Sequence, residues 1–241
     1  MIYKEDINIE DSHIHFSCDV KVDIKPYIKN LRKIIEDEIK VNPEFIGYTP
    51  SDVIGDARIL KLMQKASTIA DTGPMAAVAG SISQMCMEYV NSSFDSNYVI
   101  VENGGDISLK TNKKTIVSVD AGSSNVYTDS LAFKVKEKRS GYGICTSAAH
   151  GSSESFGNTD ATIVFSKQCS ISDTLATQIA NHGIGSSGRE ILENALVCAD
   201  EYNEFYDGVV IIKDEYITKV GHIPKFVMID DESPKNTYEI I

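Results

Sequence analysis

The sequence predicts an α+β protein with a largely antiparallel sheet. Segments typical of strands come first, followed by helices, a run of closely spaced strands, two further helices and a strand-rich C-terminal part. This order differs from the regular strand–helix–strand alternation of parallel α/β sheets. The chain has no repeat at a fixed period and no convincing linker. We therefore expect one domain over residues 1–241, with two closely joined halves as the alternative.

The N-terminal part is expected to form a hairpin and then a helix. Apolar and polar residues alternate over residues 13–22, which predicts a half-buried strand, and Ile7 and Ile9 indicate a partner strand before it. From Pro26 onward, apolar residues recur at helical spacing until Pro43 ends the pattern.

Two more helices are expected before the run of strands. The first begins with Ser51 as its N-cap. The second follows a turn at Gly73, has Pro74 in its first position and continues to about Tyr89. Its many Ala and Gly residues predict a close approach to another backbone. The later expected elements are strands over 98–102, 107–110, 115–120, 131–136 and 161–165, helices over 173–181 and 187–197, and strands over 209–212, 216–220 and 226–229.

The charge of the chain limits its partners. Lys and Arg number 23 against 35 Asp and Glu, a net charge of −12, so neither nucleic acid nor a membrane surface is expected to bind. An anionic small ligand would need a metal ion or clustered backbone N–H groups to overcome this field. Residues 140–188 hold one Lys and three acidic residues among many Ser, Thr and Gly. This window predicts packed polar loops whose N–H groups turn toward a ligand.

Other features indicate a cytoplasmic location. The N-terminus lacks the apolar segment of a secretory signal, and no apolar stretch approaches the length of a membrane span. Five widely spaced cysteines without a C-x-x-C pair predict free thiols rather than disulfides or a zinc site.

The segment Asn103-Gly104-Gly105-Asp106 lies between two predicted strands. Asn-Gly is typical of a tight hairpin turn, because both residues tolerate positive φ. Alternatively, Gly104 and Gly105 admit a ligand to the backbone while Asp106 accepts a hydrogen bond from it. The spacing does not decide between these interpretations.

Asp173 and Thr177 stand four residues apart in a predicted helix. Ser172 as N-cap, with Asp173 in the first turn, would give both acid and serine a purely structural role. The spacing also places Asp173 and Thr177 on one helical face, where their oxygens could hold Mg²⁺.

Two further patterns suggest chemistry less strongly. Gly183–Gly188 fits G-x-G-x-x-G but follows a helix, so it predicts a helix end with Ser186 or Ser187 as the next N-cap rather than a dinucleotide site. Cys145, Ser147 and His150 suggest a nucleophile and a base, although no G-x-S-x-G elbow is present.

Five segments together resemble the short ApbE-like family found in archaea and anaerobic bacteria. They are Asp-Thr-Gly-Pro-Met-Ala-Ala-Val-Ala-Gly from 71, Val-Glu-Asn-Gly-Gly-Asp-Ile from 101, Gly-Ile-Cys-Thr-Ser from 143, Ser-Phe-Gly-Asn-Thr-Asp-Ala from 155 and Ser-Asp-Thr-Leu-Ala-Thr-Gln-Ile-Ala-Asn from 172. That family is distantly related to the ApbE flavin transferases, which take FAD, use Mg²⁺ and attach FMN to a Ser or Thr of a target protein.

The resemblance implies a T-fold-like antiparallel sheet packed against helices. It also implies that Asn103, Gly104, Gly105 and Asp106 correspond to the flavin-dinucleotide loop of the transferases, with Thr146 and Ser147 as further ligand contacts. Asp173 and Thr177 would correspond to their Asp-x-x-x-Thr magnesium motif. The implied cofactors are Mg²⁺ and FAD or FMN.

The sequence also departs from the transferases. Ala148, Ala149 and His150 follow Thr146-Ser147 where the transferases have Gly and an aromatic residue, and their His-Ile-x-Asp-Pro segment is absent. Enzymatic activity is therefore left open.

Three functions follow from these observations. The first is a cytoplasmic protein that binds a phosphorylated or nucleotide ligand, flavin-like, with Mg²⁺. The second is a non-catalytic accessory protein with a protein partner in anaerobic sulfur or homocysteine metabolism, a process with which relatives in methanogens are associated. The third is a Cys- or Ser-dependent hydrolase.

Overall fold

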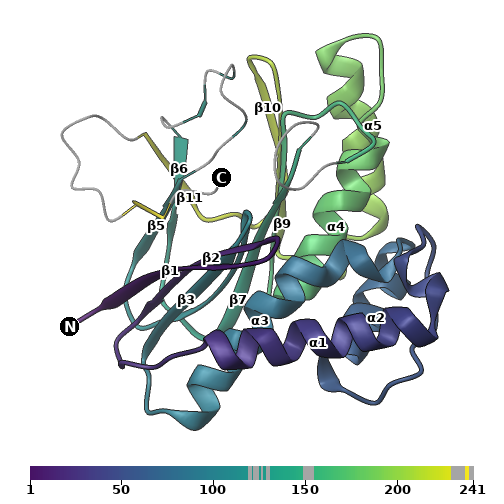
Figure 1. Cartoon of the computed structure of the whole chain (residues 1–241). Helices are drawn as coiled ribbons and strands as arrows, with labels where there is room; N and C mark the ends of the chain where they lie inside the picture. The colour runs from purple at the N-terminus through teal and green to yellow at the C-terminus, as the bar shows by residue number, and fades with distance from the viewer. Residues whose placement is uncertain are drawn as a thin grey trace.

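The computed structural model of the chain has three layers: helices, an eight-stranded sheet and a four-stranded sheet (Figure 1). It describes residues 1–118, 121, 125, 127–128, 131–148, 155–228 and 237–238. Among these residues, no helix is both long enough and apolar enough to cross a membrane.

The large sheet has the strand order β1-β2-β3-β4-β7-β8-β9-β10, and every neighbouring pair is antiparallel. Its strands are β1 Tyr3–Ile9, β2 Ser12–Cys18, β3 Tyr98–Asn103, β4 Asp106–Thr111, β7 Lys138–Ser147, β8 Ala161–Ser166, β9 Gly208–Lys213 and β10 Tyr216–Gly221. The small sheet has the order β11-β6-β5-β12, with β5 Thr115–Ser118, β6 Leu131–Val135, β11 Lys225–Met228 and β12 Thr237–Tyr238. The predicted α+β class with a largely antiparallel sheet is confirmed.

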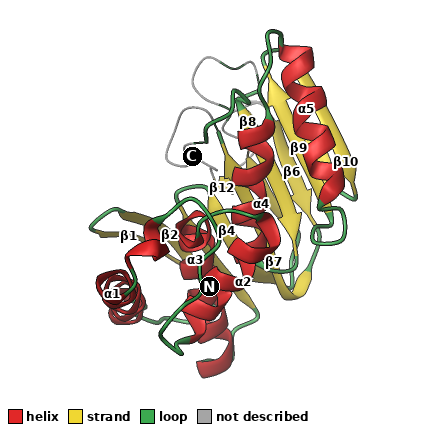
Figure 2. Cartoon of the chain, turned by 90° about the vertical axis from the view of Figure 1, so that its right-hand side faces the viewer, coloured by secondary structure: helices red, strands yellow, loops and turns green. Residues whose placement is uncertain are grey.

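In the part of the chain that the structure describes, five α-helices cover one face of the large sheet (Figure 2). They are α1 Lys25–Val41, α2 Arg58–Ala70, α3 Val78–Ser93, α4 Cys169–His182 and α5 Gly188–Glu201, with the 3₁₀ turns η1 Pro43–Ile46 and η2 Pro74–Ala77 between the earlier ones. Helices α3 and α4 contact each other and lie directly on the central strands.

The central strands of the large sheet are buried on both faces, whereas the edge strands β1 and β10 are largely exposed. Along β3, Val99 and Val101 face the helices, whereas Tyr98 and Ile100 face the small sheet. The same alternation runs through β8 and β9, whose side chains contribute to both cores. A sheet between two apolar layers needs apolar residues at successive positions, which explains why these strands appear in the sequence as continuous apolar runs.

Strand β7 was not predicted, so the expectation of polar loops was wrong for residues 140–147, whereas the strand expected over 161–165 and the helix expected over 173–181 correspond to β8 and α4. Residues 138–147 form a central strand between β4 and β8. Gly143 interrupts its apolar pattern because α4 packs against the strand backbone, whereas Gly141 has a φ of 92° and lies beside the Met87 side chain of α3. A Cβ on Gly143 would lie 2.5 Å from the Cα of Cys169.

Two predicted N-caps were also wrong. Helix α2 begins at Arg58, well after Ser51. Helix α4 begins at Cys169, so Ser172 lies inside it, and its hydroxyl donates to Ser166 Oγ at 2.8 Å. The N-cap positions observed are Ala57 in α2 and Gln168 in α4, and neither makes a side-chain cap hydrogen bond with the described residues.

The predicted boundary between the last two helices is confirmed. Helix α4 ends at His182, and Ser187 caps α5 by accepting a hydrogen bond from the backbone N–H of Glu190 at 3.3 Å. The Glu190 carboxylate accepts in turn from Ser186 N–H at 2.7 Å. These contacts account for the G-x-G-x-x-G pattern as a helix boundary. All five cysteines are buried and free.

Candidate functional site

Two neighbouring cavities open where α3 and α4 meet the β3–β4 hairpin. The acidic cavity, named for Asp106 and Asp173 in its wall, has a volume of about 330 Å³. The hairpin cavity, of about 340 Å³, is lined by Asn103 and Gly104 together with residues of β2 and α1. Met75, Val78 and Ala79 of η2 and α3 line both cavities and separate them.

Asp106 is the first residue of β4 and is buried in the wall of the acidic cavity. Neither of its carboxylate oxygens has a hydrogen-bond partner among the described residues. Burial, and then the nearby charge of Asp173, raise the pKa of Asp106 well above its usual value, although the Cys145 thiol and the Thr146 backbone, which lie close to the carboxyl group, oppose this shift. A buried carboxylate without partners is costly, so this position points to a group that the chain itself does not supply.

Asp173 lies in the second turn of α4 and faces the same cavity. Its Oδ2 accepts a hydrogen bond from the backbone N–H of Gly80 in α3 at 2.7 Å. Burial raises the pKa of Asp173 to about 7, although the Gly80 bond opposes this shift. Thr177 follows one turn later and also lines the cavity, so the structure brings together the predicted pair and adds Asp106 to it.

The arrangement offers oxygen ligands to a hard cation. Two carboxyl groups and a hydroxyl line one small cavity, and a bound cation would offset the repulsion between Asp106 and Asp173. The described part of the chain holds no group of three or more His, Cys, Asp or Glu that could hold a metal ion. A set of two carboxyl groups and one hydroxyl is compatible with Mg²⁺, which commonly uses one or two carboxylates and completes its shell with water and phosphate oxygens.

The segment Asn103–Asp106 forms a tight hairpin turn. Asn103 pairs with Asp106 across it, and Gly104 and Gly105 have φ values of 60° and 95°. The turn interpretation is thus confirmed. The turn places the predicted ligand contacts in two different cavities. Asp106 lines the acidic cavity, whereas Asn103 and Gly104 line the hairpin cavity.

Thr146 and Ser147 lie at the end of β7, beside β4. Cys145 pairs with Asp106, and the alternation of the strand puts Cys145 and Ser147 on the helix-covered face. Thr146 points to the opposite face, on the same side as Ile144. Its hydroxyl is buried with no partner among the described residues. The Thr146 hydroxyl is therefore separated from the Asp106 carboxyl group by the sheet, whereas the Thr146 backbone lies beside that carboxyl group. The role of Thr146 as a ligand contact stays a prediction.

The hydrolase interpretation gains no support from the geometry. Cys145 is fully buried, and its thiol donates to the carbonyl of Cys169 at 3.3 Å. Burial, and then the hydrogen bond with Cys169, raise the pKa of Cys145, whereas a nucleophilic cysteine needs a lowered pKa. His150 lies outside the described residues.

Residues that were not predicted to belong to a site complete the acidic cavity, although Phe156 lies in one of the segments that carry the family resemblance. Tyr48 and Phe156 line it, are 79% and 71% exposed, and meet edge to face with ring centroids 5.4 Å apart. Gly73 was expected only as a turn. A Cβ there would lie 1.8 Å from the carbonyl oxygen of Gly47, so this glycine lets the Tyr48 loop approach the start of η2.

Comparison with known proteins agrees with this arrangement of elements. The UPF0280 protein of Methanosphaera stadtmanae is 51% identical, over 99% of this chain and 98% of its own length. The UPF0280 protein of Methanobrevibacter smithii is 35% identical, over 95% and 98%.

Solved structures share the fold at low identity. The flavin transferase ApbE from Vibrio cholerae superposes with a TM-score of 0.58 at 12% identity, covering 91% of this chain and 96% of that one. The apo flavinyl transferase ApbE of Pseudomonas stutzeri gives 0.55 at 10% identity, covering 91% and 94%. The family model described as "AbpE bacteria" matches residues 6–192. The chain therefore belongs to this ApbE-like family, together with the UPF0280 proteins.

Proposed function

We propose that the acidic cavity binds a phosphorylated ligand of the flavin nucleotide type together with Mg²⁺. The observation that carries this proposal is Asp106, whose two buried carboxylate oxygens have no partner among the described residues. With Asp173 and Thr177 on the facing helix, it provides the oxygen ligands for a cation at the cavity wall.

The cation would also solve the problem of binding an anion to an acidic protein. A chain with a net charge of −12 repels phosphate, and two carboxylates at the site add to that repulsion. A bound Mg²⁺ supplies positive charge that bridges protein carboxylates and ligand phosphates. The chain contributes the cation ligands, and the phosphates complete the shell.

Two observations favour a flavin among phosphorylated ligands. Tyr48 and Phe156 present exposed rings at the acidic cavity, where a planar aromatic group can stack. Solved structures that share this fold carry the name flavin transferase. We infer that the rest of the ligand extends toward Asn103 and Gly104 in the hairpin cavity, around the shared wall at Met75.

The proposal is one of binding, in the cytoplasm, and it does not include FMN transfer. The accessory role in sulfur or homocysteine metabolism stays the alternative prediction. An empty acidic cavity combined with a stoichiometric protein partner recovered from the native host would favour that alternative.

Titration calorimetry with FAD and FMN, each with and without Mg²⁺, tests the proposal. We expect Mg²⁺-dependent binding by the wild type and at least tenfold weaker binding by Asp106→Asn and Asp173→Asn, with a smaller loss for Thr177→Val. Asp200→Asn on the exposed side of α5 is the matched control and should bind as the wild type does. Absence of binding by a folded wild type, or equal binding by all variants in the presence of Mg²⁺, would refute the shared site.

A further inference from the structure

A third cavity, of about 600 Å³, has a charge opposite to that of the protein as a whole. Its lining includes six basic residues and one acidic residue. The basic residues are Arg58, Lys61, Lys65, Lys110, Arg139 and Lys167. We call it the basic cavity. It lies along the C-terminal half of α3 and reaches the start of α4, whereas the acidic cavity lies along the first turn of α3.

The positive charge comes from four separate parts of the fold. Helix α2 contributes residues 58, 61 and 65 from one of its faces. Strand β4 contributes Lys110, strand β7 contributes Arg139, and the turn before α4 contributes Lys167. Because these positions are spread over more than 100 residues, no basic run is visible in the sequence, and tertiary packing alone gathers the charge.

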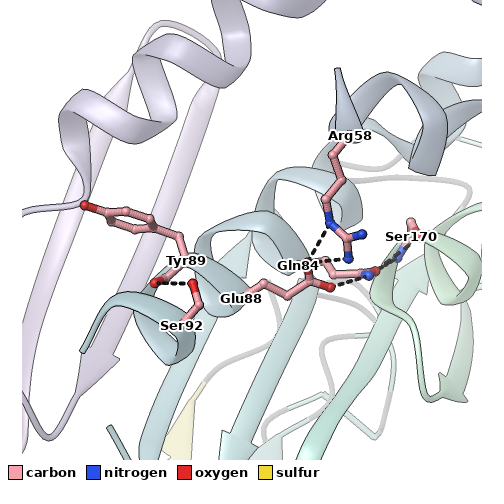
Figure 3. A network of polar contacts seen from close by, with 6 residues as sticks. All are labelled: Arg58, Gln84, Glu88, Tyr89, Ser92 and Ser170. Carbon is pink, nitrogen blue, oxygen red and sulfur yellow. Dashed lines mark hydrogen bonds and ion pairs between the residues drawn. The ribbon is translucent and has the colours of Figure 1, made fainter. Parts of the chain in front are cut away.

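The acidic residue in the lining, Glu88, is already paired (Figure 3). Its Oε2 accepts from Arg58 Nε at 3.1 Å and from Arg58 Nη2 at 2.7 Å, and its Oε1 accepts from Gln84 Nε2 at 3.0 Å. The side-chain oxygen of Gln84, Oε1, accepts in turn from the backbone N–H and the hydroxyl of Ser170, at 3.2 and 3.1 Å. This network ties α2, α3 and α4 together, and it uses both oxygens of Glu88.

The other basic groups are little compensated. Lys65 and Lys167 have no acidic group within 4.0 Å in the part of the chain that the structure describes. Lys61 and Arg139 reach only exposed acids outside the lining, Asp56 and Glu137, both at 3.6 Å. Pairs that are this long and exposed neutralise little charge. The cavity therefore keeps a positive field inside an acidic protein.

We propose that the basic cavity binds a small, multiply charged anion of the phosphate or carboxylate class, without a metal ion. Its volume lies in the range of small-molecule sites, and a net charge of −12 disfavours a large polyanion such as nucleic acid. Basic side chains on several walls can contact several anionic oxygens at once. The backbone of Cys169 at the start of α4 adds the positive end of a helix dipole at the same cavity.

Titration calorimetry with sodium pyrophosphate and with sodium citrate tests this proposal, at fixed ionic strength and in EDTA so that the acidic cavity holds no cation. The test variant is Lys61→Ala/Lys65→Ala. The matched control is Lys29→Ala/Lys33→Ala, which removes two exposed lysines at the same spacing from α1. Thermal unfolding of each variant shows that it is folded, and Lys167→Ala provides a second test at a loop position.

We expect the wild type to bind at least one of the two anions. The α2 double variant should bind at least tenfold more weakly, Lys167→Ala at least threefold more weakly, and the α1 control within twofold of the wild type. Pyrophosphate binding without citrate binding would identify phosphate as the ligand class, and the reverse would identify carboxylate. No binding by the wild type, or equal losses in the α1 and α2 variants, would overturn the proposal. Asp173→Asn should leave anion binding at the basic cavity unchanged, so this test does not depend on whether the acidic cavity binds a ligand.

Discussion

The backbone N–H of Gly80 in α3 donates a 2.7 Å hydrogen bond to Oδ2 of Asp173 in α4. The same glycine allows the two helices to lie this close. A Cβ at position 80 would lie 2.7 Å from both the Cβ of Asp173 and the carbonyl oxygen of Cys169. One missing side chain therefore sets the distance between the helices and orients the carboxyl group that lines the acidic cavity.

Gly80→Ala should destabilise the protein. Within a helix this substitution usually stabilises by about 0.5–1 kcal/mol, but here the added methyl group meets backbone that cannot move aside. We expect a net loss of about 1–3 kcal/mol in the free energy of unfolding, measured in urea. Gly188→Ala is the control, since its Cβ would meet side-chain atoms and no backbone: the carboxylate end of Asp214 at 2.8 Å, and Lys213 and Tyr216 at ordinary contact distances of 3.4 and 3.5 Å. Equal stability of Gly80→Ala and the wild type would contradict the close packing.

Asp173→Asn should stabilise the protein at high pH. The folded-state pKa of Asp173 is about 7 against 3.8 for an unperturbed group, so the folded state binds the proton more tightly. The contribution of this carboxyl to stability is therefore complete below about pH 4 and is lost as the pH rises to 7. Asn cannot ionise, so the variant should gain on the order of 2–4 kcal/mol over the wild type at pH 8, and little at pH 4.

Urea unfolding in EDTA at pH 4, 6 and 8 checks this difference. Asp37→Asn is the control with the opposite sign, because a hydrogen bond from Lys40 lowers the pKa of Asp37. Its effect should be small and destabilising above that pKa. If Asp173→Asn were no more stable than the wild type at pH 8, ionised Asp173 would not be costly in the folded protein.

Glu38→Gln should have the reverse pH dependence. Burial alone would raise the pKa of Glu38, but hydrogen bonds from the backbone N–H groups of Ile54 and Gly55, at 2.7 and 2.9 Å, outweigh it and lower the pKa. The ionised group therefore stabilises the fold above its unfolded value of 4.5, and this stabilisation is lost as the pH falls through the lowered pKa. At pH 7 we expect Glu38→Gln to lose about 1–3 kcal/mol.

Amide exchange locates this effect. The Ile54 and Gly55 amides should exchange faster in Glu38→Gln than in the wild type at neutral pH. The control is Glu36→Gln, an exposed position two residues earlier on the same helix. A loss of stability that stayed constant from pH 7 down to pH 3 would show that the charge of Glu38 is not its source.

The fold class was predictable because it depends on local patterns. The alternation in β2 and the apolar runs of β3 and β8 each report the burial of their own side chains. Strand β7 was not predicted because Gly143 interrupts its apolar pattern, and the reason for this glycine is the packing of α4, a helix from a later part of the chain. The N-cap expected at Ser172 failed for a similar reason, since Ser166 from the preceding strand binds its hydroxyl.

The candidate site likewise contains residues that local spacing predicts and residues that only tertiary packing brings together. The facing oxygens of Asp173 and Thr177 follow from helical spacing, but Asp106 joins them only because β4 and α4 pack together. The six residues of the basic cavity were not predicted either, because the net charge of the whole chain does not show where basic residues cluster in the fold. Contacts between distant segments leave no periodic trace in a single sequence.

Gly73→Ala should detach the Tyr48 loop from the acidic cavity. Its added Cβ would lie 1.8 Å from the carbonyl oxygen of Gly47 and 3.1 Å from the Cα of Tyr48, so one of the two backbone segments must move. We expect a loss of about 1–3 kcal/mol in unfolding free energy and faster amide exchange over residues 44–48. Hydrogen exchange followed by mass spectrometry measures the local change.

Asp71→Gly, two residues earlier, should not reduce the stability of the protein. Asp71 ends α2 in a left-handed conformation with φ of 53°, which glycine adopts without steric cost. This variant should match or exceed the wild type in stability by up to about 1 kcal/mol, with unchanged exchange over residues 44–48. If Gly73→Ala and Asp71→Gly both left that exchange unchanged, the close approach of Gly73 to Gly47 would not be what holds Tyr48 at the cavity. If both variants exchanged faster over residues 44–48, the conformation of the whole turn at 71–73, rather than the contact of Gly73 with Gly47, would hold the loop. Glycine at position 71 removes no contact between the turn and the Gly47–Tyr48 backbone.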